Sequence, residues 1–75
     1  MLAEEFKLYE TMWENLNFDS KKFYIKFGVL NNADQINYKE VCIIDTSFEK
    51  AIKKIYTRFG KRNVRDISLI KSEDA

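Results

Sequence analysis

Two adjacent runs of this chain alternate between apolar and other side chains, and this pattern limits its fold more than any other feature. In residues 21–30, one face carries Phe23, Ile25, Phe27 and Val29. Successive side chains of a strand point to opposite faces of a sheet, so a period of two predicts a strand. A second such run, residues 36–45, follows a polar segment of five residues. The two runs predict a β-hairpin.

The length of the connecting segment suggests a register for this hairpin. If the loop spans residues 31–35, the opposed pairs are Leu30–Ile36, Gly28–Tyr38, Lys26–Glu40 and Tyr24–Cys42. This register joins opposite charges and lays an aromatic ring over a glycine, and both pairings are favourable across strands. We therefore expect it.

A helix and a third strand are predicted after the hairpin. Thr46 and Glu49 have the spacing of a capping box, and Gly60 stands where a left-handed C-terminal cap is favoured. The apolar stripe between them predicts a helix from about Ser47 to Phe59. Residues 63–71 then predict a third strand, with Ile67 and Leu69 on one face and Val64 and Ile70 on the other. Residues 72–75 are expected to fray.

The beginning of the chain has helical rather than strand spacing. Its apolar residues fall on one arc of a helical wheel: Leu2, Phe6, Tyr9, Met12, Trp13 and Leu16. This arc predicts a helix over residues 2–16. Core packing is the default interpretation of Met12 and Trp13, and an anchor for a docked partner is the alternative.

These elements predict a single α+β domain over residues 1–75, with the order αββαβ. Its ββαβ unit (residues 21–71) would form a three-stranded antiparallel sheet in the order 2-1-3, because the third strand inserts beside the first. The odd-numbered face would pack on the second helix. The first helix would pack beside that helix or cap one end of the layer.

Residue usage argues against catalysis. The chain has no His and one cysteine, Cys42, which lies between apolar neighbours and suits a packed residue better than a nucleophile. Gly28 and Gly60 are far apart, so they form no phosphate-binding loop. We expect no enzyme activity, no metal and no cofactor. A lone cysteine and the lack of a long apolar run suggest a cytoplasmic protein with no membrane segment.

Charge is distributed unevenly although the net charge is only +1. Residues 50–65 contain seven cations and no acid, and the helical ones lie opposite the apolar stripe. A one-signed ridge suits nucleic-acid phosphates or an acidic protein surface, while the alternative is the ordinary charged face of an amphipathic helix. The candidate basic surface is Lys50, Lys53, Lys54, Arg58, Lys61, Arg62 and Arg65.

Two further surfaces are candidates for contact. Residues 1–19 are acidic, and the predicted first helix would expose Glu4, Glu10 and Glu14 as an acidic surface. The sheet face away from the second helix would carry Tyr24 and Tyr38, which could stack on unpaired bases, although burial or a homodimer contact is favoured there.

Two resemblances bear on these surfaces. Residues 23–71, with Gly60-Lys61-Arg62-Asn63-Val64 at the helix end, resemble the ββαβ unit of a family of large-subunit ribosomal proteins of archaea and eukaryotes. The proline-free run Glu5–Leu16, in a chain with abundant Lys, Asn and Ile, is similar in style to small phage and mobile-element proteins, of which anti-CRISPR proteins are the best-known group. The second resemblance implies docking on a host machine without catalysis.

The leading hypothesis is therefore a non-catalytic binding protein, a phage-type inhibitor that docks on a nucleic-acid-handling host complex in the host cytoplasm. The alternatives are a small RNA- or DNA-binding module that uses the basic ridge, and a structural homodimer.

Overall fold

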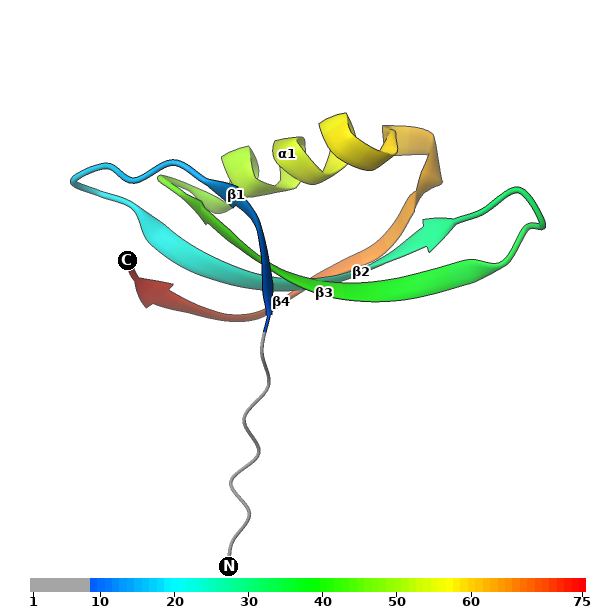
Figure 1. The fold of residues 1–75 in the computed structure, drawn as a ribbon, viewed down its shortest axis with the longest axis horizontal. Coiled ribbons are helices and arrows are strands. Elements are labelled where there is room, and N and C mark those ends of the chain that lie inside the picture. The colour runs from blue at the N-terminus through cyan, green and yellow to red at the C-terminus, as the bar shows by residue number, and fades with distance from the viewer. Residues whose placement is uncertain (1–8) are drawn as a thin grey trace, which may run out of the picture.

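The computed structural model describes residues 9–75, which form a curved four-stranded sheet with one helix over one face (Figure 1). The sheet order is β1-β3-β2-β4; β1 is parallel to β3, and the other neighbours are antiparallel. The elements are β1 (Glu10–Glu14), β2 (Lys21–Leu30), β3 (Ile36–Asp45), helix α1 (Phe48–Phe59), a 3-10 turn η1 (Lys61–Asn63) and β4 (Val64–Asp74).

The hairpin of β2 and β3 has the register expected from its loop length. The four predicted pairs, from Leu30–Ile36 to Tyr24–Cys42, are all present. The side chain of Asn31 organises the loop, because its Oδ1 accepts hydrogen bonds from the backbone N–H groups of Ala33 (2.8 Å) and Gln35 (3.0 Å). A short polar side chain that binds nearby backbone in this way favours a tight connection.

Helix α1 ends where predicted and begins one residue later than the capping-box pattern indicated. Its N-cap is Ser47, whose Oγ accepts a hydrogen bond of 3.2 Å from the backbone N–H of Lys50. Gly60 is the C-terminal cap as predicted, with φ +91° and an N–H that donates to the carbonyl of Tyr56 at 2.8 Å, but its ψ of 127° lies outside the left-handed helical region.

The core lies between α1 and one face of the sheet. The odd-numbered residues of β2 and β3 face the helix, which confirms that part of the prediction, and Ala51 and Ile55 of α1 pack on them without exposure. Apolar area removed from water contributes about 25 cal/mol per Å2, so this layer is the main stabilising element. The fully buried side chains of the sheet here include Ile25, Phe27 and Ile43.

The predicted N-terminal helix is wrong at residues 10–14, which form β1, and residues 2–8 of that prediction lie outside the described part of the chain. Without β1, the apolar end of β3 would be an unpaired sheet edge. Pairing with β3 outweighs the helical spacing of the segment, because propensity is a weak preference that tertiary contacts override. The fold class is thus corrected from αββαβ with a three-stranded antiparallel sheet to a mixed four-stranded sheet with one helix.

Strand β4 is longer and less regular than predicted. It continues to Asp74, where residues 72–74 pair with the start of β2, so the expected fraying of this segment is wrong. A bulge near Asp66, which has φ +54°, shifts the alternation of side chains. Val64 and Ile67 therefore both pack against the core, although the sequence pattern placed them on opposite faces.

Candidate functional site

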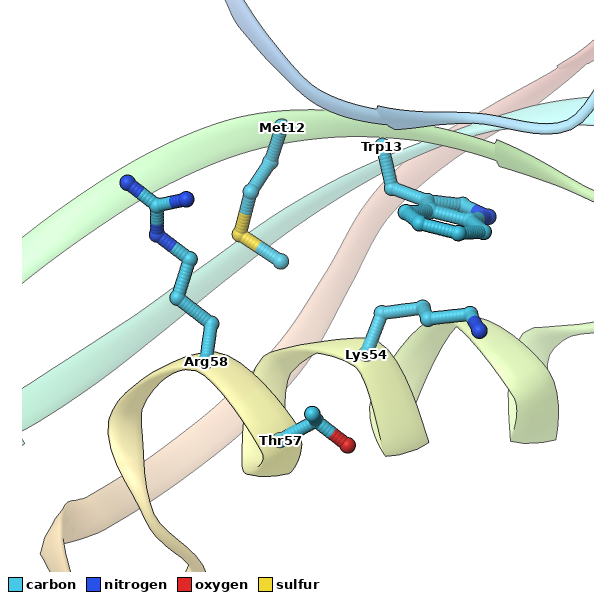
Figure 2. Close-up of a pocket in the computed structure, with 5 residues that line it drawn as sticks. All are labelled: Met12, Trp13, Lys54, Thr57 and Arg58. Atoms are coloured by element: carbon cyan, nitrogen blue, oxygen red, sulfur yellow. The ribbon is translucent and has the colours of Figure 1, made fainter.

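A groove of about 640 Å3 opens between the edge strand β1 and helix α1 (Figure 2). Met12 and Trp13 line it from β1, and Lys54, Thr57 and Arg58 line it from α1. One wall is therefore apolar and aromatic, and the facing wall carries two cations and a hydroxyl.

A bulge in β1 places both of its groove residues on the same side. The register against β3 shifts between Thr11 and Trp13, so Met12 is the extra residue. Such a bulge lets two consecutive side chains turn to one face. Figure 2 shows both side chains pointing toward α1. Met12 is partly buried against the core, as expected, whereas Trp13 remains 38% exposed.

The indole of Trp13 is held by Asp45, a carboxylate at the end of β3 that is only 1% exposed. Trp13 Nε1 donates a hydrogen bond of 3.1 Å to Asp45 Oδ2. Asp45 Oδ1 accepts from Asn15 Nδ2 (3.3 Å) and from the backbone N–H of Thr46 (2.7 Å). The buried carboxylate of Asp45 therefore connects the end of β3 to β1 and to the segment that precedes α1 through hydrogen bonds.

These contacts also determine the charge of Asp45. Burial alone would raise its pKa, but the hydrogen bonds from Thr46, Asn15 and Trp13, with the nearby charge of Lys50, hold the pKa below its usual value. Sequence reasoning missed Asp45 as a site residue. The available signal was an acid at the end of the apolar run 41–44, where a buried carboxylate needs donors.

Helix α1 brings four of the predicted cations to this region. The Nζ atom of Lys54 lies 4.0 Å from the centroid of the Trp13 ring, within range of a cation–π contact. A second hollow next to the groove is lined by Lys50, Lys53 and Lys54, with Asn15 and Asp45. We call Lys50, Lys53, Lys54 and Arg58 the groove cations; within residues 9–75 they form no ion pair with a carboxylate.

The other three predicted cations lie past the end of α1. Lys61 and Arg62 belong to η1, and Arg65 begins β4. The guanidinium of Arg65 donates to the backbone carbonyls of Arg62 and Val64, so it is engaged with its own chain. The predicted basic surface therefore consists of two parts, the groove cations and this η1 group.

The predicted acidic surface does not form on a helix. Glu10 and Glu14 are exposed at the two ends of β1, and Glu4 lies outside the described residues. Glu10 lines a hollow that also includes Lys39 and Arg58. Because β1 is extended, the two glutamates lie at its opposite ends. They do not form the acidic helix surface that the sequence predicted.

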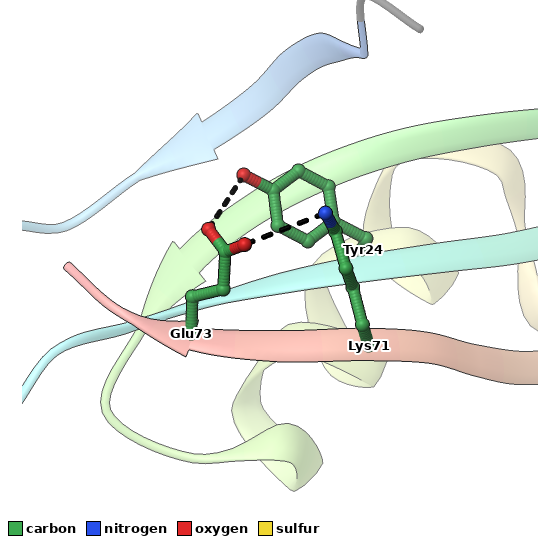
Figure 3. A network of polar contacts seen from close by, with 3 residues as sticks. All are labelled: Tyr24, Lys71 and Glu73. Carbon is green, nitrogen blue, oxygen red and sulfur yellow. Dashed lines mark hydrogen bonds and ion pairs between the residues drawn. The ribbon is translucent and has the colours of Figure 1, made fainter. Parts of the chain in front are cut away.

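Tyr24 and Tyr38 lie on the sheet face away from α1, and both are engaged within the protein. The Tyr24 hydroxyl donates to Glu73 Oε1 at 3.3 Å, and Glu73 Oε2 lies 3.4 Å from Lys71 Nζ (Figure 3). The Tyr38 hydroxyl donates to Asp66 at 3.0 Å. Lysine nitrogens lie 4.8 Å and 5.4 Å from the centroids of the Tyr24 and Tyr38 rings.

These contacts engage the hydroxyl groups of both tyrosines. Burial raises the pKa of Tyr24, and the hydrogen bond to Asp66 raises that of Tyr38. Cys42 is buried beside Tyr24, and burial raises the pKa of its thiol, which disfavours the reactive thiolate. The hydroxyl groups of the predicted sheet-face contacts are thus engaged within the protein, while Tyr38 remains 54% exposed.

No group of three or more His, Cys, Asp or Glu residues that could hold a metal ion occurs in residues 9–75. Over the same part of the chain, no helix has the length and apolar character needed to cross a membrane. No protein-family model matches this chain, and neither a curated protein nor a solved structure is significantly similar to it.

Proposed function

We propose that this chain is a non-catalytic binding domain that binds nucleic acid through the groove cations of α1. The observation that carries the proposal is their setting: four cations on one helix face, which form no ion pair within residues 9–75, stand beside an exposed aromatic ring. Cations near aromatic rings are the usual means of holding a phosphate backbone and its bases.

The spacing of these cations supports a linear partner. Lys50, Lys54 and Arg58 are four residues apart in sequence, so each is displaced from the next by about 6 Å along the helix axis. A row of charges at that interval suits the successive phosphates of a nucleic-acid strand. A nucleic-acid strand would supply anions to these cations, and counterion release would drive the association.

Salt dependence tests the proposal directly. We expect the affinity for a labelled oligonucleotide to fall linearly on a log–log plot of binding constant against salt, with a slope of about −0.7 to −0.9 per phosphate neutralised. Four contacts would give a slope of about −3. Fluorescence anisotropy at several salt concentrations measures it, and absence of binding to both strands and duplexes at low salt would overturn the proposal.

A matched pair of charge reversals locates the surface. The variant Lys53→Glu, Arg58→Glu changes two groove cations, and the control Lys61→Glu, Arg62→Glu makes the same charge change in η1. We expect the first to weaken binding and to flatten the salt slope by about 1.5, and the second to have a smaller effect. Equal losses in both variants would show that net charge, and not the groove, determines binding.

A protein partner is the competing occupant of the same surface. The idea of a phage-type inhibitor stays a prediction, now restricted to docking through α1 because the acidic helix is absent from residues 10–14. Recovery of a stoichiometric acidic protein, together with no affinity for nucleic acid, would favour it. Homodimerisation also stays a prediction, and sedimentation at two concentrations tests it; bulges in both edge strands, β1 and β4, work against strand pairing.

A further inference from the structure

We infer that the groove is selective for single strands, because it seats one unpaired base on the indole of Trp13 while Lys54 and Arg58 hold the flanking phosphates. This inference rests on the proposed function and adds the substrate class and the residue that selects it. It follows from the position, the exposure and the surroundings of Trp13.

The indole is fixed before any ligand arrives. Its Nε1 is bound to Asp45, which is itself held by Asn15 and Thr46, so the ring has one orientation in the groove. A ring that is already oriented loses less conformational entropy on binding. More than a third of Trp13 is nevertheless exposed, which is unusual for a large aromatic residue with a buried hydrogen-bond partner.

The side chain that the described residues place over the ring is a flexible lysine. Lys54 Nζ lies 4.0 Å from the ring centroid, and Figure 2 shows the lysine stem running beneath the indole from α1. A lysine has a flexible four-carbon stem and a strongly hydrated charge. A base can replace the ammonium group over the ring, and the released ammonium can pair with the phosphate next to that base.

The geometry of the groove disfavours a duplex. Trp13 lies between a strand and a helix, and Met12 closes the apolar wall beside it. Bases in a duplex are paired and stacked, so a ring in this position would meet the sugar-phosphate backbone. An unpaired base can turn into the groove, and every base has a π-face, so stacking requires no particular sequence.

The test compares three probes of equal length with the full chain; the two single strands also carry equal charge, and the duplex carries about twice that charge. The probes are an oligothymidylate of about 12 nucleotides, the same strand with abasic sites at every position, and a duplex. Trp13 is the only tryptophan, so its emission reports on the groove. We expect quenching by the oligothymidylate alone, and an affinity about 5- to 150-fold above that for the abasic strand.

Two variants separate stacking from folding. Trp13→Ala should lower the affinity for the labelled oligothymidylate to that for the abasic strand. Trp13→Phe keeps a flat ring but loses the Asp45 hydrogen bond, and it should retain most of the preference. If Trp13→Ala fails to fold by circular dichroism, the abasic and Trp13→Phe comparisons still decide the question.

The outcomes distinguish this inference from the proposed function. Equal affinity for intact and abasic strands would overturn base stacking and leave nucleic-acid binding intact. Tighter binding of the duplex would overturn single-strand selectivity alone. No binding of any probe overturns both, and tighter binding of polyglutamate than of the oligothymidylate would assign the groove to an acidic protein segment.

Discussion

The two faces of the sheet combine aromatic rings, lysines and carboxylates in similar ways, but they differ in the cations around the rings. On the face away from α1, Tyr24 and Tyr38 each have a lysine over the ring and a carboxylate at the hydroxyl, and Lys71 pairs with Glu73. On the helix side, Trp13 also has a lysine over its ring and a carboxylate at its nitrogen. There, however, the groove cations form no ion pair within residues 9–75.

This difference shows which surface is available for binding. Rings and charges that satisfy each other gain little from a partner, because a ligand must first displace existing contacts. The groove cations form no ion pair within residues 9–75, although Asp45 lies near Lys50 and Glu10 shares a hollow with Arg58, so their positive charge is available to an external anion. The predictions below test whether the first face is mainly structural and whether the second depends on the packing of α1 and β1.

The largest effect is expected from Ile55→Ala. Ile55 is fully buried and anchors α1 on the sheet, so its truncation should lower the free energy of unfolding by about 2–5 kcal/mol. Urea denaturation measures the loss. The control Ile70→Ala, at an exposed position of β4, should stay within about 0.5 kcal/mol. Similar losses in both would contradict the assignment of the core.

Asp45→Asn should destabilise the attachment of β1. The amide presents donors where Trp13, Asn15 and Thr46 also donate, and we expect a loss of about 1–3 kcal/mol together with a shift of Trp13 emission. The matched control is Asp66→Asn on the other face, where the carboxylate is exposed and a loss below about 0.5 kcal/mol is expected. Unchanged emission in Asp45→Asn would contradict the positioning role.

Gly28→Ala tests the close cross-strand packing opposite the helix side. An added Cβ would come within 2.5 Å of Ile36 Cγ2 and 3.1 Å of the Tyr38 ring. Ile36 is partly exposed and can shift, so we expect a loss of only about 1 kcal/mol. Combining Gly28→Ala with Ile36→Ala should remove most of the penalty in a double-mutant cycle of unfolding measurements. An undiminished penalty would locate the strain elsewhere.

Stability should also depend on pH through Asp45. Its pKa is lower in the folded chain than in the unfolded one, so the ionised carboxylate stabilises the fold above the unfolded value, near pH 4. That contribution is lost as the pH falls from about 4 through the folded pKa. Urea titrations between pH 6 and pH 2 should therefore show a smaller decline for Asp45→Asn than for the original chain. Parallel declines would show that other carboxylates dominate.

The smallest effect is expected from Lys71→Met. The Lys71–Glu73 pair is about half exposed, and such surface pairs contribute at most a few tenths of a kcal/mol. Both the free energy of unfolding and the affinity for oligothymidylate should change little. Lys54→Met, which removes the lysine over the groove ring, should in contrast weaken binding. A larger effect of Lys71→Met on affinity would move the binding surface to the other face.

Most of the local structure could be predicted, and most of the site could not. The hairpin register was predicted from the alternation and the loop length in residues 21–45. Helix α1 was predicted from its cap signals, although its N-cap is Ser47, one residue after the Thr46 that the pattern indicated. The basic helix face was also found. The sequence did not reveal the groove, because its other wall, β1, has helical spacing, and because Asp45 stands at the end of an apolar run, far in sequence from its donor Trp13.

The sequence by itself determined the elements whose signals lie within a few residues of one another: the two strands of the hairpin, helix α1 and the charged face of that helix. Only the tertiary structure decided that residues 10–14 form a strand, since Trp13 finds its partner Asp45 32 positions later. The bulges of β1 and β4 were likewise decided by the tertiary structure. Alternation is visible along the chain, but pairing between distant strands depends on the backbone groups and side chains that folding brings together.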